Sequence, residues 1–327
     1  MLIDTQNRVI NYLRVSVTDR CNLRCIYCMS RDGVDMKARS EILSFEELEK
    51  IISVAAKSGV SKVRITGGEP LIRKGLIDFI SRISKISEIK DLSMTTNGIL
   101  LKENAFALKA AGLQRVNVSL DTLDPQKYRE ITENGEIERV WDGIFEAEKA
   151  GLLPVKINLV VVRGLNDNEL CDFSQLTRKY QYDIRFIEYM PVGATNYWSK
   201  EKFMSSSEIL ERISKKLGEL TPLETADHSP ATYFKLSNSK GRIGVISPIS
   251  NHFCSSCNKL RLTSDGRLRA CLFSDDEVDL KAILRSNCSA ENINNLLKEA
   301  VLRKPKDHNL KEGESFLLER TMSQIGG

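Results

Sequence analysis

The sequence predicts an α/β protein whose parallel strands form a sheet that is closed or partly closed into a barrel. Short β-rich runs alternate with segments of helical period between Tyr12 and Glu188. Six strand–helix repeats favour a parallel sheet, because parallel strands need a crossover between them, usually a helix. The predicted strands are Tyr12–Val17, Lys62–Thr66, Asp91–Thr95, Arg115–Leu120, Val155–Val162 and Asp183–Glu188.

Two of the intervening segments carry clear helix signals. The first covers Ser44–Lys57, and its Ser44 and Glu47 have the spacing of a capping box. The second covers Gly75–Ile86, where apolar residues recur with helical period. These helices support the alternation on which the predicted barrel depends.

The pattern changes near Leu220. Beyond it, Ala231–Leu236 and Arg242–Pro248 flank the turn 238–241 and predict a hairpin. We therefore divide the chain into a partial barrel over residues 1–220 and a C-terminal region over residues 221–327.

The predicted strands end beside polar, small or cysteine residues. Ligands of such folds gather at the carboxyl ends of the strands, so we expect the functional site there. The segments at these ends are the cysteine loop 21–28, Gly67–Pro70, Thr96–Gly98, Ser119–Asp121 and Glu188–Pro191.

The composition suits a cytoplasmic enzyme. With 327 residues and a net charge of +4, the chain can bury a large core, and its charge does not by itself indicate nucleic-acid or membrane binding. It has no basic-then-apolar leader and no apolar run long enough to span a bilayer. The eight cysteines favour metal ligands or core residues over disulfides in a reducing compartment.

Cys21, Cys25 and Cys28 form the most informative motif, with the spacing C-x3-C-x2-C directly after the first predicted strand. Three thiolates can hold three irons of a cubane and leave the fourth iron open for a small molecule. The alternatives are a disulfide or a structural zinc loop, although zinc sites usually close with a fourth Cys or His nearby. No His lies near this loop in the sequence.

Cys254, Cys257 and Cys271 repeat this logic in the C-terminal region, with the spacing C-x2-C-x13-C. The spacing also fits a zinc ribbon that lacks one ligand, which Cys288 or His252 could supply. A second cluster with an open iron could instead hold a substrate atom directly.

The first cysteine loop, with Tyr27 before its last cysteine, resembles the signature of radical S-adenosylmethionine enzymes. The resemblance implies a TIM-like partial (β/α)6 barrel, a 4Fe-4S cluster and S-adenosylmethionine, whose cleavage gives a 5′-deoxyadenosyl radical. Gly67-Gly68-Glu69-Pro70 resembles the family segment that approaches the methionine part of this cofactor. By the same resemblance, the residues that bind S-adenosylmethionine are Tyr27, Gly68, Ser119 and Met190.

Both cysteine motifs and the terminal Gly326-Gly327 together resemble the GTP 3′,8-cyclases, radical enzymes that begin molybdenum cofactor biosynthesis. The resemblance implies a second 4Fe-4S cluster in the C-terminal region, which closes the barrel. This second cluster anchors the guanine of GTP. The adenosyl radical then removes the ribose 3′ hydrogen, and the carbon radical attacks guanine C8. The family tail suggests that Gly326 and Gly327 thread into the active site.

GTP carries about four negative charges near neutral pH, so several basic side chains must surround it. Positions that match the family place the GTP contacts on the predicted strands and just after Cys257. Where relatives commonly carry Arg-x-Arg, this chain has Lys259-Leu260-Arg261, and a lysine lacks the planar two-point contact of a guanidinium. The predicted GTP residues are Arg14, Arg64, Thr95, Lys156, Lys259 and Arg261, with Arg185 as a further residue facing the cavity.

The resemblance also implies partners: an electron donor such as flavodoxin or ferredoxin, and cyclic pyranopterin monophosphate synthase as the next enzyme. We expect no nucleic acid or membrane partner, and a homodimer is compatible with the sequence. Two other functions remain open from the residues alone. One is a radical peptide maturase with an auxiliary cluster, and the other is a non-catalytic iron–sulfur or zinc protein that binds a nucleotide.

Overall fold

The computed structural model describes residues 1–28, 37–192, 197–224, 230–286, 289–308, 310 and 318–326. Each of the first six strands ends within one residue of its predicted bounds. The strands are β1 Tyr12–Ser16, β2 Lys62–Thr66, β3 Asp91–Thr96, β4 Arg115–Ser119, β5 Lys156–Val161, β6 Asp183–Glu188, β7 Leu220–Leu223, β8 Ala231–Leu236, β9 Arg242–Ile246, β10 Lys259–Leu262, β11 Arg267–Arg269 and β12 Glu277–Asp279.

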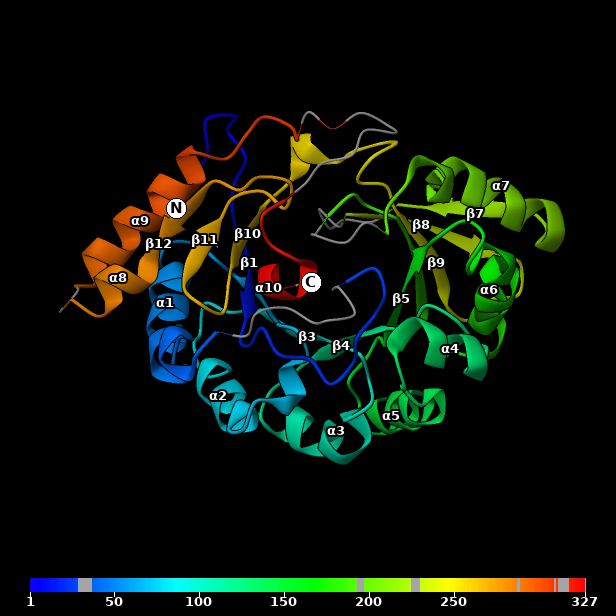
Figure 1. The fold of residues 1–327 in the computed structure, drawn as a ribbon, viewed down its shortest axis with the longest axis horizontal. Coiled ribbons are helices and arrows are strands. Elements are labelled where there is room, and N and C mark those ends of the chain that lie inside the picture. The colour runs from blue at the N-terminus through cyan, green and yellow to red at the C-terminus, as the bar shows by residue number, and fades with distance from the viewer. Residues whose placement is uncertain are drawn as a thin grey trace.

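Helices follow most of the barrel strands and line the outside of the sheet (Figure 1). The predicted capping box is confirmed, since the Ser44 hydroxyl accepts from the Glu47 amide and the Glu47 carboxylate accepts from the Ser44 amide. The helices are α1 Phe45–Lys57, α2 Leu76–Ile83, α3 Leu101–Ala110, α4 Pro125–Thr132, α5 Ile137–Lys149, α6 Leu170–Lys179, α7 Ser206–Leu217, α8 Leu280–Leu284, α9 Ala290–Leu302 and α10 Met322–Ile325.

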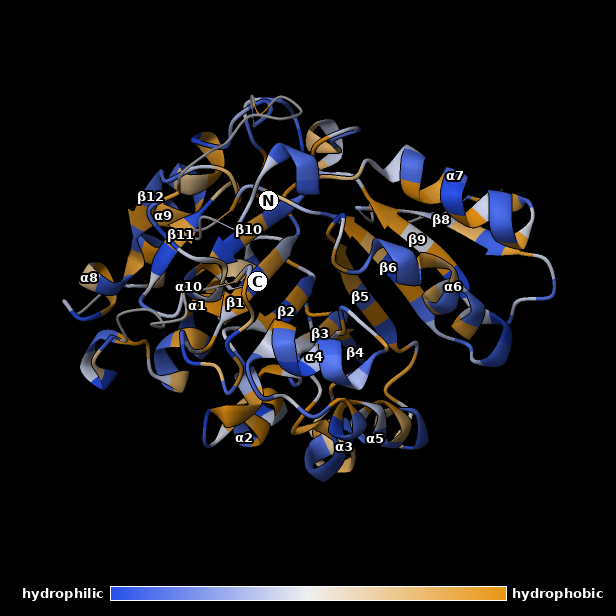
Figure 2. Cartoon of the chain, turned by 45° about the vertical axis from the view of Figure 1, so that its right-hand side comes forward, coloured by the Kyte–Doolittle hydropathy of each residue, from blue (hydrophilic) through white to orange (hydrophobic). Residues whose placement is uncertain are grey.

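All twelve strands of the described chain belong to one sheet, in the order β12-β11-β10-β1-β2-β3-β4-β5-β6-β9-β8-β7. Strands β1 to β6 run parallel to their neighbours, as the strand–helix alternation predicts. The core between the sheet and its helices includes fully buried Leu13, Val63, Val116 and Ile157. Figure 2 shows the matching pattern, with hydrophobic strands inside and hydrophilic outer faces on the helices. The fold is therefore a partial α/β barrel.

Residues beyond Leu220 extend both edges of this sheet. The predicted hairpin is confirmed as β8 and β9, and β9 also pairs in parallel with β6. At the other edge, β10 pairs in parallel with β1. The short helix α10, near the C-terminus, lies within the arc of strands (Figure 1). The second cysteine motif, which flanks β10 and β11, is thus joined to the same sheet as the first.

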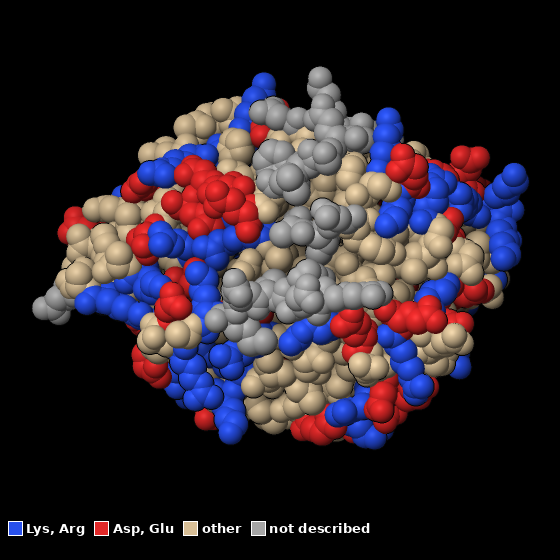
Figure 3. Space-filling model, viewed as in Figure 1, with Lys and Arg blue, Asp and Glu red and all other residues tan. Residues whose placement is uncertain are grey.

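No helix of the described residues is both long and apolar enough to cross a membrane. On the face drawn in Figure 3, acidic and basic side chains are interspersed.

Candidate functional site

One cavity of about 400 Å³ extends along the inside of the barrel, from residues that begin the strands, such as Tyr12 and Lys156, to the loops at their carboxyl ends, and both cysteine motifs line it. The structure brings every predicted site residue outside the C-terminal tail to this cavity. These residues are Cys21, Cys25, Cys28, Cys254, Cys257, Cys271, Tyr27, Gly68, Ser119, Met190, Arg14, Arg64, Thr95, Lys156, Lys259, Arg261 and Arg185.

Cys21, Cys25 and Cys28, here called the first triad, lie in the loop after β1. The Sγ of Cys21 accepts hydrogen bonds from the Leu23 amide at 3.4 Å and from Nδ2 of Asn97 at 3.8 Å. Burial raises the pKa of all three thiols, and for Cys28 the pKa reaches about 12. Three buried thiolates need cationic compensation, which bound iron provides, so the donor set fits an iron–sulfur cluster with one open iron.

The first triad has buried acidic neighbours and a nearby cation, Arg24, whose Nη1 donates to the Cys21 carbonyl at 2.8 Å. Burial raises the pKa of Asp121 to about 6 and that of Glu69 to about 7. The Tyr27 hydroxyl donates to Asp121 Oδ2, while the Glu69 carboxylate accepts from the backbone amides of Leu71 and Asn97. This triad therefore sits where additional negative charge is disfavoured.

Gly68 holds the cysteine loop close to the sheet. Its amide donates to the Thr18 carbonyl at 2.8 Å, and a Cβ at this position would lie 2.2 Å from the Arg20 carbonyl oxygen. Any side chain here would push the loop away from β2, so the glycine is needed for the placement of the first triad.

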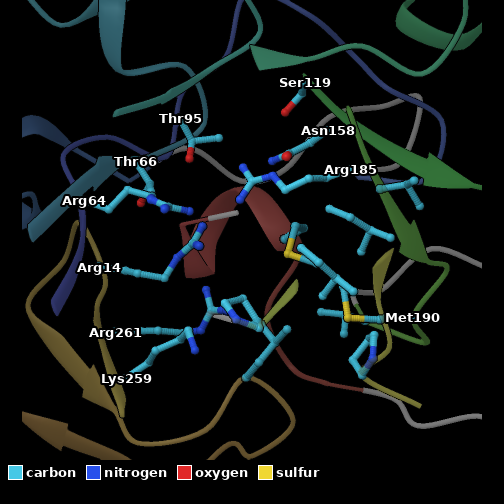
Figure 4. A pocket seen from close by; sticks show the side chains of 18 of the residues that line it. Arg14, Arg64, Thr66, Thr95, Ser119, Asn158, Arg185, Met190, Lys259 and Arg261 are labelled. Carbon is cyan, nitrogen blue, oxygen red and sulfur yellow. The ribbon is translucent and has the colours of Figure 1, made fainter. Parts of the chain in front are cut away.

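Strand register aligns a polar row on the side of the cavity formed by β4, β5 and β6. Ser119 is opposite Asn158, and Asn158 is opposite Arg185 in the parallel ladder. Figure 4 shows the three side chains beside one another, with Met190 nearby. The Oδ1 of Asn158 is buried and has no partner among the described residues, so this row can accept a polar ligand.

A second row, made of cations, lines the side of the cavity formed by β10, β1 and β2. Arg14 on β1 is opposite Arg261 on β10 and Arg64 on β2. Neighbouring parallel strands lie about 4.8 Å apart, so this register stacks like charges. Burial lowers the pKa of Arg14, aided by the Arg261 charge, and lowers the pKa of Arg261 to about 10. Such a row is suited to a polyanion.

Two lysines and a fourth arginine add further positive charge to the cavity. Burial lowers the pKa of Lys156 and of Lys259 to about 8 in each case. Lys156 Nζ lies 3.4 Å from Asp183 Oδ2, while Lys259 lies over the rings of Tyr12 and Phe253. Arg185 is only 3% exposed and donates to Asn117 Oδ1. In Figure 4 the side chains of Arg14 and Arg261 extend toward the centre of the cavity.

Thr95 and Thr66 offer hydroxyl groups to the same cavity. Both Oγ1 atoms are buried without a partner in the described part of the chain. A buried hydroxyl without a hydrogen bond is costly, so both are positioned to bond a ligand.

Cys254, Cys257 and Cys271, the second triad, lie before β10 and after β11. Burial raises the pKa of Cys254 to about 11. The pKa of Cys257 is instead lowered, because the charges of Lys304 and Lys259 outweigh the effect of burial. Three converging thiols with nearby cations again fit an iron–sulfur cluster.

Two histidines adjoin the second triad: His252, which precedes Cys254 by two residues, and His308, for which the sequence spacing gives no sign. The ring nitrogens of His252 and His308 and the Sγ of Cys254 lie within 4.8 Å of one another. However, Nε2 of His308 is 2.7 Å from the Pro248 carbonyl, and its Nδ1 accepts from the Leu310 amide at 3.1 Å. Both nitrogens of His308 are therefore occupied, so His308 is not available as a zinc ligand. The zinc alternative names His252 or Cys288 as the fourth ligand: His252 lies close to Cys254, and Cys288 lies outside the described residues.

The C-terminal tail contacts the first triad and the cation row. The Gly326 carbonyl accepts from Arg14 Nη2 at 3.3 Å, and the Ser323 backbone hydrogen-bonds to Cys28. Gly326 has φ 89°, and a Cβ there would lie 2.7 Å from Thr66 Oγ1. The backbone conformation and the contact both favour glycine. Gly327 lies outside the described residues.

Comparisons with known proteins agree with this arrangement. Residues 15–177 match the Radical SAM superfamily, and residues 182–310 match the Molybdenum Cofactor Synthesis C family. A GTP 3′,8-cyclase of Thermodesulfovibrio yellowstonii is 52% identical over 99% of both chains. A GTP 3′,8-cyclase of Alkaliphilus oremlandii is 49% identical, also over 99% of both chains.

The chain belongs to the GTP 3′,8-cyclase family. The predicted family membership is thereby confirmed, as is the radical SAM fold. The solved structure of Streptococcus suis SuiB has a TM-score of 0.61 at 16% identity, covering 90% of this chain and 69% of SuiB. At that identity the likeness supports the shared fold only.

Several residues that line the cavity were missed in the sequence analysis. Asn158 could have been found, because it lies two residues after Lys156 on one strand and so shares its face. Thr66 likewise ends β2 two residues after Arg64. His308 could not have been found from the sequence, because only the fold brings it close to Cys254.

Proposed function

We propose that this protein is a GTP 3′,8-cyclase that catalyses the first step of molybdenum cofactor biosynthesis. Its product is (8S)-3′,8-cyclo-7,8-dihydroguanosine 5′-triphosphate. One observation carries the proposal: two cysteine triads face a single cavity, and a row of buried cations crosses the sheet beside the second triad. A polyanionic substrate can then lie within reach of both triads.

In this proposal the first triad, Cys21, Cys25 and Cys28, holds a 4Fe-4S cluster and S-adenosylmethionine. When bound, this pair supplies a 5′-deoxyadenosyl radical that removes the ribose 3′ hydrogen of GTP. Tyr27, Gly68, Ser119 and Met190 hold the cofactor. The unpartnered Asn158 beside Ser119 supports a polar contact on that side of the cavity.

The second triad, Cys254, Cys257 and Cys271, holds a second 4Fe-4S cluster whose open iron anchors the guanine. Arg14, Arg64, Lys156, Lys259 and Arg261 neutralise the triphosphate, and Thr95 donates its hydroxyl to the nucleotide. The stacked guanidinium groups support this role, because an anion relieves their mutual repulsion. Arg185, which lines the cavity, is proposed as a catalytic residue.

Gly326 and Gly327 act on the bound substrate as the end of the C-terminal tail. The contact between the Gly326 carbonyl and Arg14 supports this role, since Arg14 belongs to the proposed triphosphate site. Excluding water from the cavity is a further function of this tail.

We also propose the cellular setting. The protein works in the cytoplasm with flavodoxin or ferredoxin as electron donor, and it passes its product to cyclic pyranopterin monophosphate synthase. A homodimer is its proposed assembly, with neither nucleic acid nor a membrane as partner. Residues 1–220 and 221–327 are proposed as the partial barrel and the auxiliary-cluster region.

Anaerobic incubation with dithionite, S-adenosylmethionine and GTP tests the proposal. Reconstituted protein should hold about eight irons, roughly four for each cluster, and should form 5′-deoxyadenosine and the cyclic product. GTP deuterated at the ribose 3′ position should transfer deuterium to 5′-deoxyadenosine. Formation of 5′-deoxyadenosine with a peptide but not with GTP would refute the assignment, and one bound zinc would refute the second cluster.

A further inference from the structure

Lys304 is a buried lysine with no place in the proposed reaction. It follows α9 and is only 4% exposed. Its Nζ donates to the Lys259 carbonyl at 2.9 Å and to the Ala270 carbonyl at 2.5 Å, and its side chain also hydrogen-bonds to Cys257. An ammonium group has three donors, and these contacts account for all three.

These three contacts join the chain segments that carry the second triad. Lys259 begins β10, two residues after Cys257, while Ala270 directly precedes Cys271. The ammonium therefore ties together the segments on either side of the β10–β11 hairpin. A lysine buried to this degree needs a compensating negative group, and the Cys257 thiolate provides one.

Lys304 approaches the triad from outside the cavity. Lys259 and Arg261 line the cavity, whereas Lys304 does not appear among the described residues that line it. Its charge therefore acts on the sulfur ligands and not on a molecule in the cavity. The first triad differs, because the charged neighbours of its buried thiol Cys25 are Asp121 and the other thiols.

We propose that Lys304 is a positioning residue of the second iron–sulfur cluster. It fixes the spacing of the ligand segments, and its charge stabilises the one-electron reduced cluster and so raises its reduction potential. The inference rests on the proposed function in one respect, that the second triad holds such a cluster. Hydrogen bonds to the sulfurs and nearby charge are known to set the potentials of these clusters.

The test uses the full chain with Cys21, Cys25 and Cys28 replaced by alanine, so that only the second cluster forms. Lys304→Gln keeps hydrogen-bond donors but removes the charge, while Lys304→Arg keeps the charge. Lys306→Gln removes the same charge from an exposed position two residues away. Each protein is reconstituted with iron and sulfide, and iron content is measured without GTP. The reduced cluster is followed by electron paramagnetic resonance during titration with dithionite.

Lys304→Gln should lower the equilibrium constant for one-electron reduction about tenfold, which corresponds to about 59 mV. Lys304→Arg should restore most of that loss, and Lys306→Gln should leave the midpoint unchanged. If Lys304→Gln loses its iron while Lys304→Arg keeps it, the result also supports the proposal that the charge of Lys304 stabilises the second cluster. Equal midpoints in all variants, or equal iron loss from the Gln and Arg variants, would overturn the role of Lys304.

The failure of the proposed function would look different. A parent protein that binds no iron at the second triad contradicts the cluster itself, before any Lys304 variant is compared. A parent with about four irons and unchanged midpoints in its variants overturns only the inference about Lys304.

Discussion

The two cysteine triads lie on one cavity but differ in the charged groups around them. Burial raises the pKa of every thiol in the first triad, where Asp121 and Glu69 are the buried acidic neighbours. In the second triad, Lys304 and Lys259 lower the pKa of Cys257 despite its burial. Two similar sets of cysteine ligands thus lie in different electrostatic environments.

This difference matches a division of labour. A low-dielectric, acidic setting destabilises added electrons, which makes a reduced cluster a strong reductant. A setting rich in cations attracts a triphosphate and tolerates added negative charge. The same sheet supplies both, because β10 brings Arg261 beside Arg14 while the first triad follows β1.

Cys21→Ala is the most direct way to break the comparison. The first triad should lose its cluster, so the formation of 5′-deoxyadenosine should fall to background, while GTP affinity changes less than about threefold because the cation row is intact. Anaerobic product analysis and equilibrium dialysis with GTP measure the two quantities.

Cys257→Ala is the matched counterpart at the second triad. It should weaken GTP binding roughly 10- to 100-fold, the range expected when the surroundings of a metal site are disturbed. Slow cleavage of S-adenosylmethionine should persist. If both variants lose GTP binding equally, the triads do not divide the work as proposed.

Shortening the tail tests the segment that contacts Cys28 and Arg14. Removing Gly326 and Gly327, or replacing Gly326 with alanine, should reduce cyclisation roughly 100-fold, because small displacements of positioning groups have effects of that size. A Cβ at Gly326 would collide with Thr66 and Ser16. Iron content should remain unchanged, and full cyclisation by the truncated protein would contradict the proposed role.

The pH dependence of GTP affinity tests the cationic side of the cavity. Burial lowers the pKa of Lys156 and Lys259 to about 8, and a lysine is charged only below its pKa. GTP binds the charged forms, so affinity should be full near pH 7 and fall as pH rises through 8. Each lysine contributes up to about tenfold per pH unit.

Lys259→Arg should reduce that slope, because a guanidinium stays protonated throughout this range. Lys156 alone would then cause the remaining loss. Lys306→Arg serves as the exposed control and should leave the wild-type slope. A slope that is identical in Lys259→Arg and wild type would show that Lys259 does not contact the nucleotide.

Sequence patterns predicted the fold closely because local rules and the sheet agree. Period-2 and helical patterns located the barrel strands, and Ser44 with Glu47 located the start of α1. The pairing of β10 with β1 could not be predicted. Lys259 pairs with Tyr12, which lies 247 residues earlier, and nothing in the local sequence Lys259–Leu262 specifies that partner.

The site was predicted in part for the same reason. The cysteine spacings and the family resemblance identified residues within short motifs. Lys304 and His308 carry no motif, and their importance appears only when the chain after α9 packs against the second triad. Charge rows that depend on strand register are likewise invisible in a linear sequence.

Cys171→Ala is expected to have the smallest effect. Cys171 lies on α6 and is only 6% exposed. Its replacement should cost about 1 kcal/mol of unfolding free energy, as for other modest core changes. Iron content and both reaction rates should match the wild type, and any loss of iron would mean that a cysteine outside the two triads binds a cluster.

A crystal structure of the anaerobically reconstituted protein with GTP tests the central claim most directly. We predict iron anomalous signal at both triads, with guanine against the second cluster and the triphosphate along Arg14, Arg64 and Arg261. GTP bound at the first cluster or outside the cavity, or a second triad without iron, would contradict the division of labour between the two triads.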